Sequence, residues 1–440
     1  MKITNITIRG YRNIKNVMIE MQNLLSFVSI NNYGKSNLLR GIDFGFDFIT
    51  RSEKVRKRMM SYYDGIPLNP FNENENFYFQ IEGSFKDDQL LYFKYGYEFV
   101  WNKDDNSGNK IINEWLDIKE NGSSHYKKML DRRGCLFKKD FDTKYKNKLV
   151  LNEAQLFVDV LPSNSDIKYL NLINKIKNIK FNYCSLLDAN PNFEPMPFHF
   201  IDEEDIVPYN DSDIPRALYY LNENTPAKFK EFKNAIFRLY PDFEDMSFNK
   251  KDIEAKMTKQ IVLSNVDNNE ENTELIPPTL IKDQIYQIFI KTKYLNQPIS
   301  MSRMSAGTKR IFWILLNVLM SSEMNVNMLA IEELETSIHP SLLKKLLEEI
   351  DMLSQNINIL ISSHSTNILQ YLNPEQIYIG IPNEKGLAEF SKIKQSKYTK
   401  LKNIANNLGM SYGEYIFNYI SQCDEEYYEQ IKMLLENIND

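Results

Sequence analysis

The tripeptide Gly34-Lys35-Ser36 has the residue types that bind phosphate groups. It follows an apolar run over residues 24–28 that predicts a strand, and it precedes apolar residues from Leu38 onward with helical spacing. Backbone N–H groups between a strand and a helix can surround a phosphate, and the positive end of the helix points at the same anion. In such a loop Lys35 would neutralise the β- and γ-phosphates, and the Ser36 hydroxyl would hold Mg²⁺.

The stretch departs from the full phosphate-loop pattern at its first position. The pattern Gly-x-x-x-x-Gly-Lys-Ser/Thr has glycine where this chain has Ser29, and a side chain there restricts φ at the start of the loop. A bare Gly-Lys-Ser can also be an ordinary strand–helix turn with a lysine in it. The rest of the chain has to decide between the two interpretations.

Two adjacent carboxylates, Glu332 and Glu333, are the second candidate element. They directly follow residues 327–331, a short apolar run that predicts a buried strand. A strand that ends on two carboxylates can direct one toward Mg²⁺ and the next toward an attacking water molecule. Residues 358–361 predict the next buried strand, and His364 follows it at the end where α/β sheets bind their ligands. A lone histidine is otherwise usually structural.

A run of small residues at 304–310 precedes a predicted apolar helix over residues 311–320. Ser305 and Gly307 would let the backbone approach an anion closely, and the helix N-terminus supplies a favourable field. Taken alone, Ser-Ala-Gly-Thr is only a good helix cap.

Composition limits the class of protein. The chain has 440 residues, a net charge of −6 and three cysteines without paired spacing. This excludes a disulfide scaffold and a CxxC metal site, and it suits a reducing cytoplasm. No apolar run is long enough to span a membrane, and the chain opens directly into a predicted strand. We therefore predict a cytoplasmic protein.

The pattern of the chain predicts an α/β fold in four parts. Alternating apolar residues within 3–21, 77–99 and 111–118 predict an antiparallel β region, and helical spacing prevails between about 152 and 257. The predicted parts are residues 1–150, an N-terminal lobe; 151–280, a mostly helical insertion; 281–385, a C-terminal lobe; and 386–440, a helical extension with an amphipathic stretch over 427–438. Basic runs at 51–58 and 127–148 could meet nucleic acid, or be solvated helix ends and hairpins.

Together these pieces resemble the ABC-type ATPases of the SMC, RecF and OLD group, and most closely the AAA-domain type-15 branch of bacterial anti-phage defence. The resemblance rests on four motifs in order: Walker A at 31–37, the signature at 304–310, Walker B at 331–333, and the switch histidine at 361–365. It implies an ABC-type ATPase head, with a β-rich first lobe, a mostly parallel sheet with flanking helices, and a helical insertion. OLD-type relatives continue into a Toprim nuclease, whose carboxylate set is not evident after Gly380.

The resemblance also implies a role for each matching residue, with ATP and Mg²⁺ as cofactors. Glu333 would polarise the attacking water, His364 would contact the γ-phosphate, and Ser36 with Glu332 would hold the metal. ATP would be bound by Asn31, Asn32, Tyr33, Gly34, Lys35, Ser36 and Asn37, and by Ser305 and Gly307 of a second subunit. Glu332 stands where aspartate is commoner in the family, and its extra methylene group displaces the carboxylate.

Three functional hypotheses follow from the resemblance. In the first, an ATPase forms a homodimer or larger assembly around ATP and regulates a separate effector, a nuclease, in anti-phage defence. The alternative is an ATP-dependent DNA clamp of the RecF or SMC type, acting in repair or chromosome maintenance. The third is a nucleotide-bound scaffold with negligible hydrolysis, suggested by Ser29 and Glu332.

Overall fold

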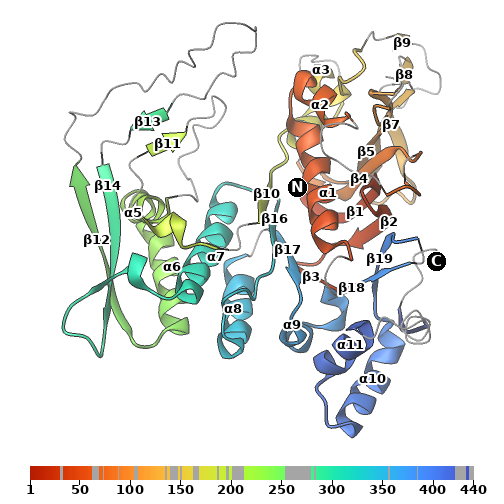
Figure 1. Ribbon diagram of the computed structural model, residues 1–440. Coiled ribbons are helices and arrows are strands. Elements are labelled where there is room, and N and C mark those ends of the chain that lie inside the picture. The colour runs from red at the N-terminus through yellow and green to blue at the C-terminus, as the bar shows by residue number, and fades with distance from the viewer. Residues whose placement is uncertain are drawn as a thin grey trace, which may run out of the picture. The chain divides into compact units, whose positions relative to one another are not determined.

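The chain divides into two units, and each unit combines separate segments of the sequence (Figure 1). The first comprises residues 1–185, 321–335 and 354–440, and the second comprises residues 186–320 and 336–353. The computed structural model describes residues 1–29, 33–61, 69–72, 74–87, 89–103, 108–133, 136–138, 147–148, 151–161, 168–185, 188–194, 198–200, 213–252, 279–281, 284–354, 357–383, 385–421 and 433–435.

A 14-stranded sheet runs through the first unit, and five consecutive strands of it are parallel. In spatial order these are β10 (Phe181–Cys184), β16 (Met328–Ile331), β17 (Asn358–Ser363), β3 (Leu24–Val28) and β18 (Ile377–Pro382). Strands β3, β16 and β17 are buried along their whole length, as is typical of parallel strands covered on both faces. Because parallel strands end at the same edge of a sheet, the carboxyl ends of β3, β16 and β17 lie next to one another.

The remaining strands form a mainly antiparallel extension of the same sheet. They are β19 (Ala388–Lys392), β2 (Ile14–Glu20), β1 (Lys2–Tyr11), β4 (Phe77–Lys86), β5 (Leu90–Val100), β6 (Lys110–Glu120), β7 (Lys127–Arg133), β8 (Leu136–Lys138) and β9 (Asn147–Lys148). Burial alternates along β4, and Phe77, Phe79 and Ile81 face the core. Helix α1 (Lys35–Thr50) packs closely on this face, since a Cβ at Gly45 would lie 2.3 Å from the Phe79 ring. The predicted α/β class, with a β-rich part and a parallel sheet, is confirmed.

Seven helices are described in the first unit: α1, α2 (Glu53–Met59), α3 (Phe157–Val160), α4 (Leu170–Lys177), α9 (Thr366–Tyr371), α10 (Gln395–Asn407) and α11 (Tyr412–Ser421). One residue of the basic run in α2 is neither solvated nor free to contact nucleic acid. Arg56 is fully buried, and its guanidinium donates to both carboxylate oxygens of Asp159, at 2.5 and 2.8 Å. The sequence interpretation missed this ion pair because the partner lies far along the chain.

The second unit joins helices to a small antiparallel sheet. Its described elements are a 3₁₀ turn (Pro191–Phe193), β11 (Phe198–Phe200), α5 (Ile214–Asn224), α6 (Pro226–Leu239), β12 (Phe243–Asp252), β13 (Thr279–Ile281), β14 (Gln284–Thr292), β15 (Ile299–Ser300), a 3₁₀ turn (Met301–Arg303), most of α7 (Ala306–Glu323) and α8 (Pro340–Leu353). A bidentate ion pair joins α6 to α8: Arg238 Nε and Nη2 each donate to one carboxylate oxygen of Glu349 at 2.6 Å.

Among the described residues, β10, β11, β12 and most of β13 lie where the sequence predicted a mostly helical insertion. Strand β10 adds an edge to the parallel sheet, and β12 pairs with β14 over almost its whole length. Most of the predicted amphipathic stretch over 427–438, all but residues 433–435, and much of the basic run over 127–148 lie outside the described residues. The boundaries of the four predicted parts stay predictions. In the described part of the chain, no helix combines the length and apolar character needed to cross a membrane.

Candidate functional site

The phosphate-loop candidate connects the end of β3 to the start of α1. Gly34 is the N-cap of α1 and has φ +95°, a left-handed conformation that glycine adopts without strain. A Cβ at Gly34 would also lie 2.7 Å from the Cβ of Ala388. Among the described residues no side chain caps this helix, and its first turn holds no acidic residue, so the N-terminal field of α1 favours an anion. Asn31 and Asn32 lie outside the described residues.

Lys35 is the first residue of α1, and only 5% of it is exposed. Its Nζ donates to the Ser29 carbonyl oxygen at 2.6 Å and to Ser29 Oγ at 3.2 Å. Burial lowers the pKa of Lys35 to about 8, although the nearby carboxylates of Glu333, Glu335 and Glu332 favour its charged form. Ser29, the departure from the glycine pattern, therefore gives the ammonium a second oxygen that glycine would lack.

His364 bridges the lysine and the second carboxylate of the Walker B candidate. Its Nδ1 lies 3.0 Å from Lys35 Nζ, and its Nε2 lies 3.2 Å from Glu333 Oε1. Because a lysine ammonium can only donate, Nδ1 must be the acceptor, and Nε2 then carries the proton and donates to Glu333. The structure thus brings together three residues that are far apart in the sequence. They follow the carboxyl ends of the neighbouring strands β3, β16 and β17.

The chain bends sharply where β16 ends. Glu333 has φ +45°, rare for a residue with a side chain, and its N–H donates to Ser362 Oγ at 3.1 Å. Glu332 is buried and hydrogen-bonds the Tyr183 hydroxyl on β10, to which Arg40 Nε also donates at 3.4 Å. Burial raises the pKa of Tyr183, so its hydroxyl keeps its proton and can donate to the Glu332 carboxylate.

The other residues of the phosphate-loop candidate differ in their surroundings. Ser36 is exposed, and Tyr33 is half-buried. The Asn37 side chain accepts from Arg12 Nη1 at 3.1 Å and donates to Asn13 Oδ1 at 2.9 Å. In this structure Asn37 therefore fixes the start of α1 to the turn between β1 and β2.

The signature residues belong to the second unit, whereas Lys35, Glu333 and His364 belong to the first. Ser305 is exposed and directly precedes α7, and its Oγ accepts from the Thr308 N–H in the first turn of the helix at 3.2 Å. A Cβ at Gly307 would come 2.3 Å from the Ser337 carbonyl oxygen, so close packing alone already requires a glycine.

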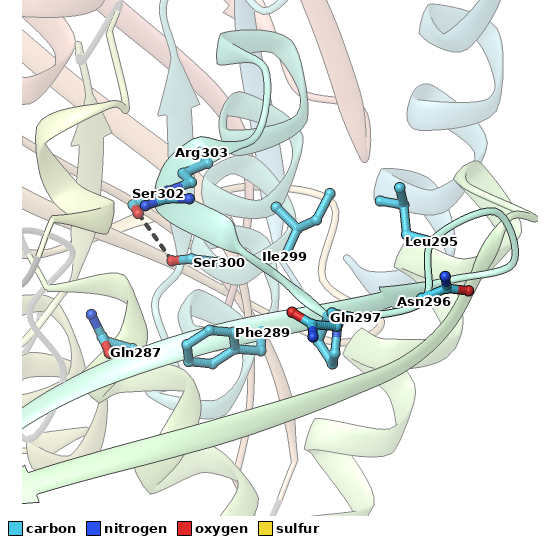
Figure 2. Close-up of a pocket in the computed structure, with 10 residues that line it drawn as sticks. Gln287, Phe289, Leu295, Asn296, Gln297, Ile299, Ser300, Ser302 and Arg303 are labelled. Carbon is cyan, nitrogen blue, oxygen red and sulfur yellow. Dashed lines mark hydrogen bonds between the residues drawn. The ribbon is translucent and has the colours of Figure 1, made fainter.

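A surface hollow of about 640 Å³ lies just before the signature in the second unit (Figure 2). Strand β14 contributes Gln287 and Phe289, residues 295–299 form one side, and Arg303 borders it. The hydroxyls of Ser300 and Ser302 lie 3.0 Å apart within this lining. No residue that the sequence singled out as a site residue lines this hollow.

The donor set suits Mg²⁺ bound together with a triphosphate. Among the described residues, no group of three or more His, Cys, Asp or Glu side chains could hold a metal by itself. Mg²⁺ in nucleotide sites usually keeps one or two protein oxygens and takes the rest from phosphates and water. A serine hydroxyl and a carboxylate, as in Ser36 and Glu332, fit that requirement.

Sequence reasoning missed three residues of this site. Tyr183 was overlooked because residues 181–184 were assigned to a helical region, although Phe181 and Tyr183 alternate as in a strand. Arg40 lies one turn beyond the expected loop, on the face of α1 toward β10. Glu335 was not singled out, because its contacts with the histidine strand have no local sequence signal.

A family model described as AAA ATPase domain (AAA_15) matches residues 1–369. An Smc head bound to the C-winged helix domain of ScpA is 13% identical, with 91% of this chain and 100% of that chain covered and a TM-score of 0.48. The SMC head domain from Thermotoga maritima is 9% identical, with 90% and 100% covered and a TM-score of 0.43. An Smc head domain with an extended coiled coil, bound to the C-terminal domain of ScpA derived from Pyrococcus furiosus, is 12% identical, with 92% and 99% covered and a TM-score of 0.43. The comparison with curated proteins gave no match.

Proposed function

The chain belongs to the AAA ATPase domain family, and from this premise we propose that it hydrolyses ATP to ADP and phosphate with Mg²⁺ at the carboxyl ends of β3, β16 and β17. The observation that carries the proposal is the chain of contacts from Lys35 through His364 to Glu333, at 3.0 and 3.2 Å. A phosphate-binding cation, a candidate switch and a candidate base thus lie within one small region. An ordinary strand–helix turn would not require this arrangement.

Binding would use the positive charge that is already concentrated at the start of α1. Lys35 can exchange the Ser29 carbonyl oxygen for phosphate oxygens, and the main-chain N–H groups at the start of α1 can donate to the same anion. Ser36 and Glu332 would hold Mg²⁺, with Tyr183 and Arg40 fixing the Glu332 carboxylate from the side. The bound metal supplies charge neutralisation for the phosphate oxygens.

Hydrolysis would require His364 to release Glu333. In the resting arrangement the Nε2 proton of His364 occupies Glu333 Oε1. When His364 turns this proton toward the γ-phosphate, Glu333 Oε1 becomes available to accept a proton from the attacking water. The water oxygen then forms the new bond to phosphorus, and the bond between phosphorus and the ADP oxygen breaks.

Phosphate release by purified variants tests the proposal. Glu333→Gln should lower kcat by about 100-fold or more, the range expected for loss of a general base, while ATP still binds. Lys35→Ala should abolish binding of the nucleotide. Glu348→Gln changes an exposed glutamate of α8 and should behave like the unsubstituted protein. Turnover that survives Glu333→Gln would contradict the proposed role of Glu333.

Assembly around ATP is the next part of the proposal. Ser305 and Gly307 of one subunit would contact the γ-phosphate held by another, and the exposed position of Ser305 at a helix N-terminus supports this. In Glu333→Gln, which retains ATP, the particle mass should double or more on ATP addition. Ser305→Arg should abolish that increase and leave nucleotide binding by the single subunit intact. An unchanged mass with ATP would exclude the sandwich.

The proposed consequence of assembly is regulation of a separate nuclease in anti-phage defence, which is supported by the family resemblance. The alternative DNA clamp has weaker support, since two lysines of the antiparallel strands, Lys94 and Lys128, are paired with acids. Lys94 lies 3.0 Å from Glu82 and Lys128 lies 3.3 Å from Asp131. ATP-dependent DNA binding that weakens steeply with salt would favour the clamp, and its absence at low salt would remove that alternative.

A further inference from the structure

A third carboxylate follows the Walker B candidate and contacts the strand that carries the histidine. One oxygen of Glu335, Oε1, accepts from the main-chain N–H of His364 at 2.6 Å and from Ser363 Oγ at 2.9 Å. Both donors lie at the carboxyl end of β17, one strand away from β16. Glu335 is therefore hydrogen-bonded to His364, which bears the imidazole, and to Ser363 before it.

The contact continues into the helix that follows. Ser363 Oγ also accepts from the Ser365 N–H at 2.9 Å, and Ser365 caps α9 by accepting from the Asn367 N–H at 3.2 Å. Glu335 thus sits at the start of a continuous set of hydrogen bonds from β16 to α9. Displacement of its carboxylate would loosen the backbone on both sides of His364.

The charge of Glu335 requires its own explanation. Its second oxygen, Oε2, is buried and has no hydrogen-bond partner in the described part of the chain. Burying a carboxylate oxygen without a partner is unfavourable, and a neutral amide of the same size could accept the same two hydrogen bonds. The compensation lies in the Lys35 ammonium, on which Glu335 acts through its charge.

We propose that Glu335 is a positioning residue of the ATPase site, which holds the backbone of His364 so that the imidazole spans the gap between Lys35 and Glu333. It touches neither reacting atom, and it acts through two donors of β17 and through its charge near Lys35. The predicted effect on ATP turnover rests on the proposed function. The claim that Glu335 holds the backbone of His364 rests only on the hydrogen bonds of the resting structure.

Two variants and a control separate positioning from general stability. Glu335→Ala removes both hydrogen bonds and the charge, whereas Glu335→Gln keeps an acceptor oxygen and removes only the charge. Glu348→Gln again serves as the control. For each protein we would measure kcat and KM for ATP, the number of bound nucleotides, and hydrogen–deuterium exchange in the peptide covering residues 362–367.

The expected result is a graded loss in rate at constant nucleotide occupancy. Glu335→Ala should lower kcat by about 100-fold, the size of effect expected from displacement of a catalytic group by an ångström or so, with KM changed little. Glu335→Gln should fall between Ala and the unsubstituted protein. Exchange at the His364 amide should rise about tenfold in Glu335→Ala, since a hydrogen bond to a charged acceptor is lost.

Each other outcome is also informative. If kcat per bound nucleotide in Glu335→Ala equals that of the control, the positioning role is wrong. If the unsubstituted protein does not hydrolyse ATP, the proposed function is wrong, and exchange at His364 then decides the backbone claim alone. Unchanged protection of that amide in both variants would overturn the claim. If Glu335→Ala does not fold, the same comparisons are made with Glu335→Gln.

Discussion

Replacement of Lys35 by methionine should change how the stability of the first unit depends on pH. Methionine has a similar length and no charge, so Lys35→Met removes the ionisable group and retains most of the packing. It also removes the hydrogen bonds to Ser29, which lowers stability by an amount that does not vary with pH. Any pH-dependent difference between the two proteins therefore reports the ionisation of Lys35.

The size of this difference follows from the burial of the ammonium. Its pKa is about 8 in the folded protein and 10.5 in a solvated lysine. At 1.36 kcal/mol for each pH unit this interval corresponds to at most about 3 kcal/mol. Below pH 8 both states are protonated and the full cost of burial is present. Between pH 8 and 10.5 the unfolded state binds more protons, so the stability of the unsubstituted protein rises with pH relative to Lys35→Met.

The assay is urea unfolding between pH 7 and 10, followed by tryptophan fluorescence. Trp101 and Trp115 lie in the first unit and Trp313 in the second, so a Trp313→Phe background restricts the signal to the unit that contains Lys35. Lys175→Met, at an exposed position of α4, is the matched control. It should run parallel to the unsubstituted protein.

Parallel stability profiles for Lys35→Met and the unsubstituted protein would refute the reasoning. They would mean that the ammonium is as well solvated in the folded protein as in the unfolded chain. A difference of the opposite sign would mean that the three carboxylates overcompensate for burial. In either case the idea that Lys35 is held in a costly environment ready for phosphate would be wrong.

Three further perturbations test other parts of the structure. Gly34→Ala should lower the free energy of unfolding, measured by thermal denaturation, by about 1–2 kcal/mol because of the left-handed φ alone. The new Cβ would also lie 2.7 Å from the Cβ of Ala388, and adding Ala388→Gly should recover only the loss caused by that contact. Arg56→Met should destabilise the first unit by about 3–5 kcal/mol in urea unfolding, because it leaves a carboxylate without its buried partner, whereas Arg58→Met at an exposed position should change little. Burial raises the pKa of Glu114 to about 7, so between pH 4.5 and 7 the folded state binds a proton that the unfolded state releases. The free energy of unfolding in urea should therefore fall by at most about 3 kcal/mol across this range. Glu114→Gln should flatten that fall.

The parts of the fold that were predictable from the sequence have short-range signals. The central strands β16 and β17 hold short runs of three or four apolar residues followed by polar motifs, and burial alternates strictly along β4. The order of these motifs along the chain also predicted which residues should lie close together at one site. The α/β class followed from these signals and from the resemblance.

The parts that were not predictable depend on partners far along the chain. Arg56 looks like any charge in a basic run until its partner, about a hundred residues later, is known. Strand β10 has only four residues, and its pairing with β16 gives it a structural role that its own composition does not reveal. Glu335 needs the register of β16 against β17 before its contact with His364 can be recognised.

The departure at Ser29 shows how local and distant information combine. Judged by the pattern alone, a serine in place of the first glycine weakens the phosphate-loop interpretation. In the structure both oxygens of Ser29 contact the Lys35 ammonium, and His364 is the third partner. A buried ammonium needs three acceptors to satisfy its three hydrogens. The serine therefore gives the resting ammonium a hydroxyl acceptor that the glycine of the pattern would lack, so the departure from the pattern has a local structural role beside the lysine.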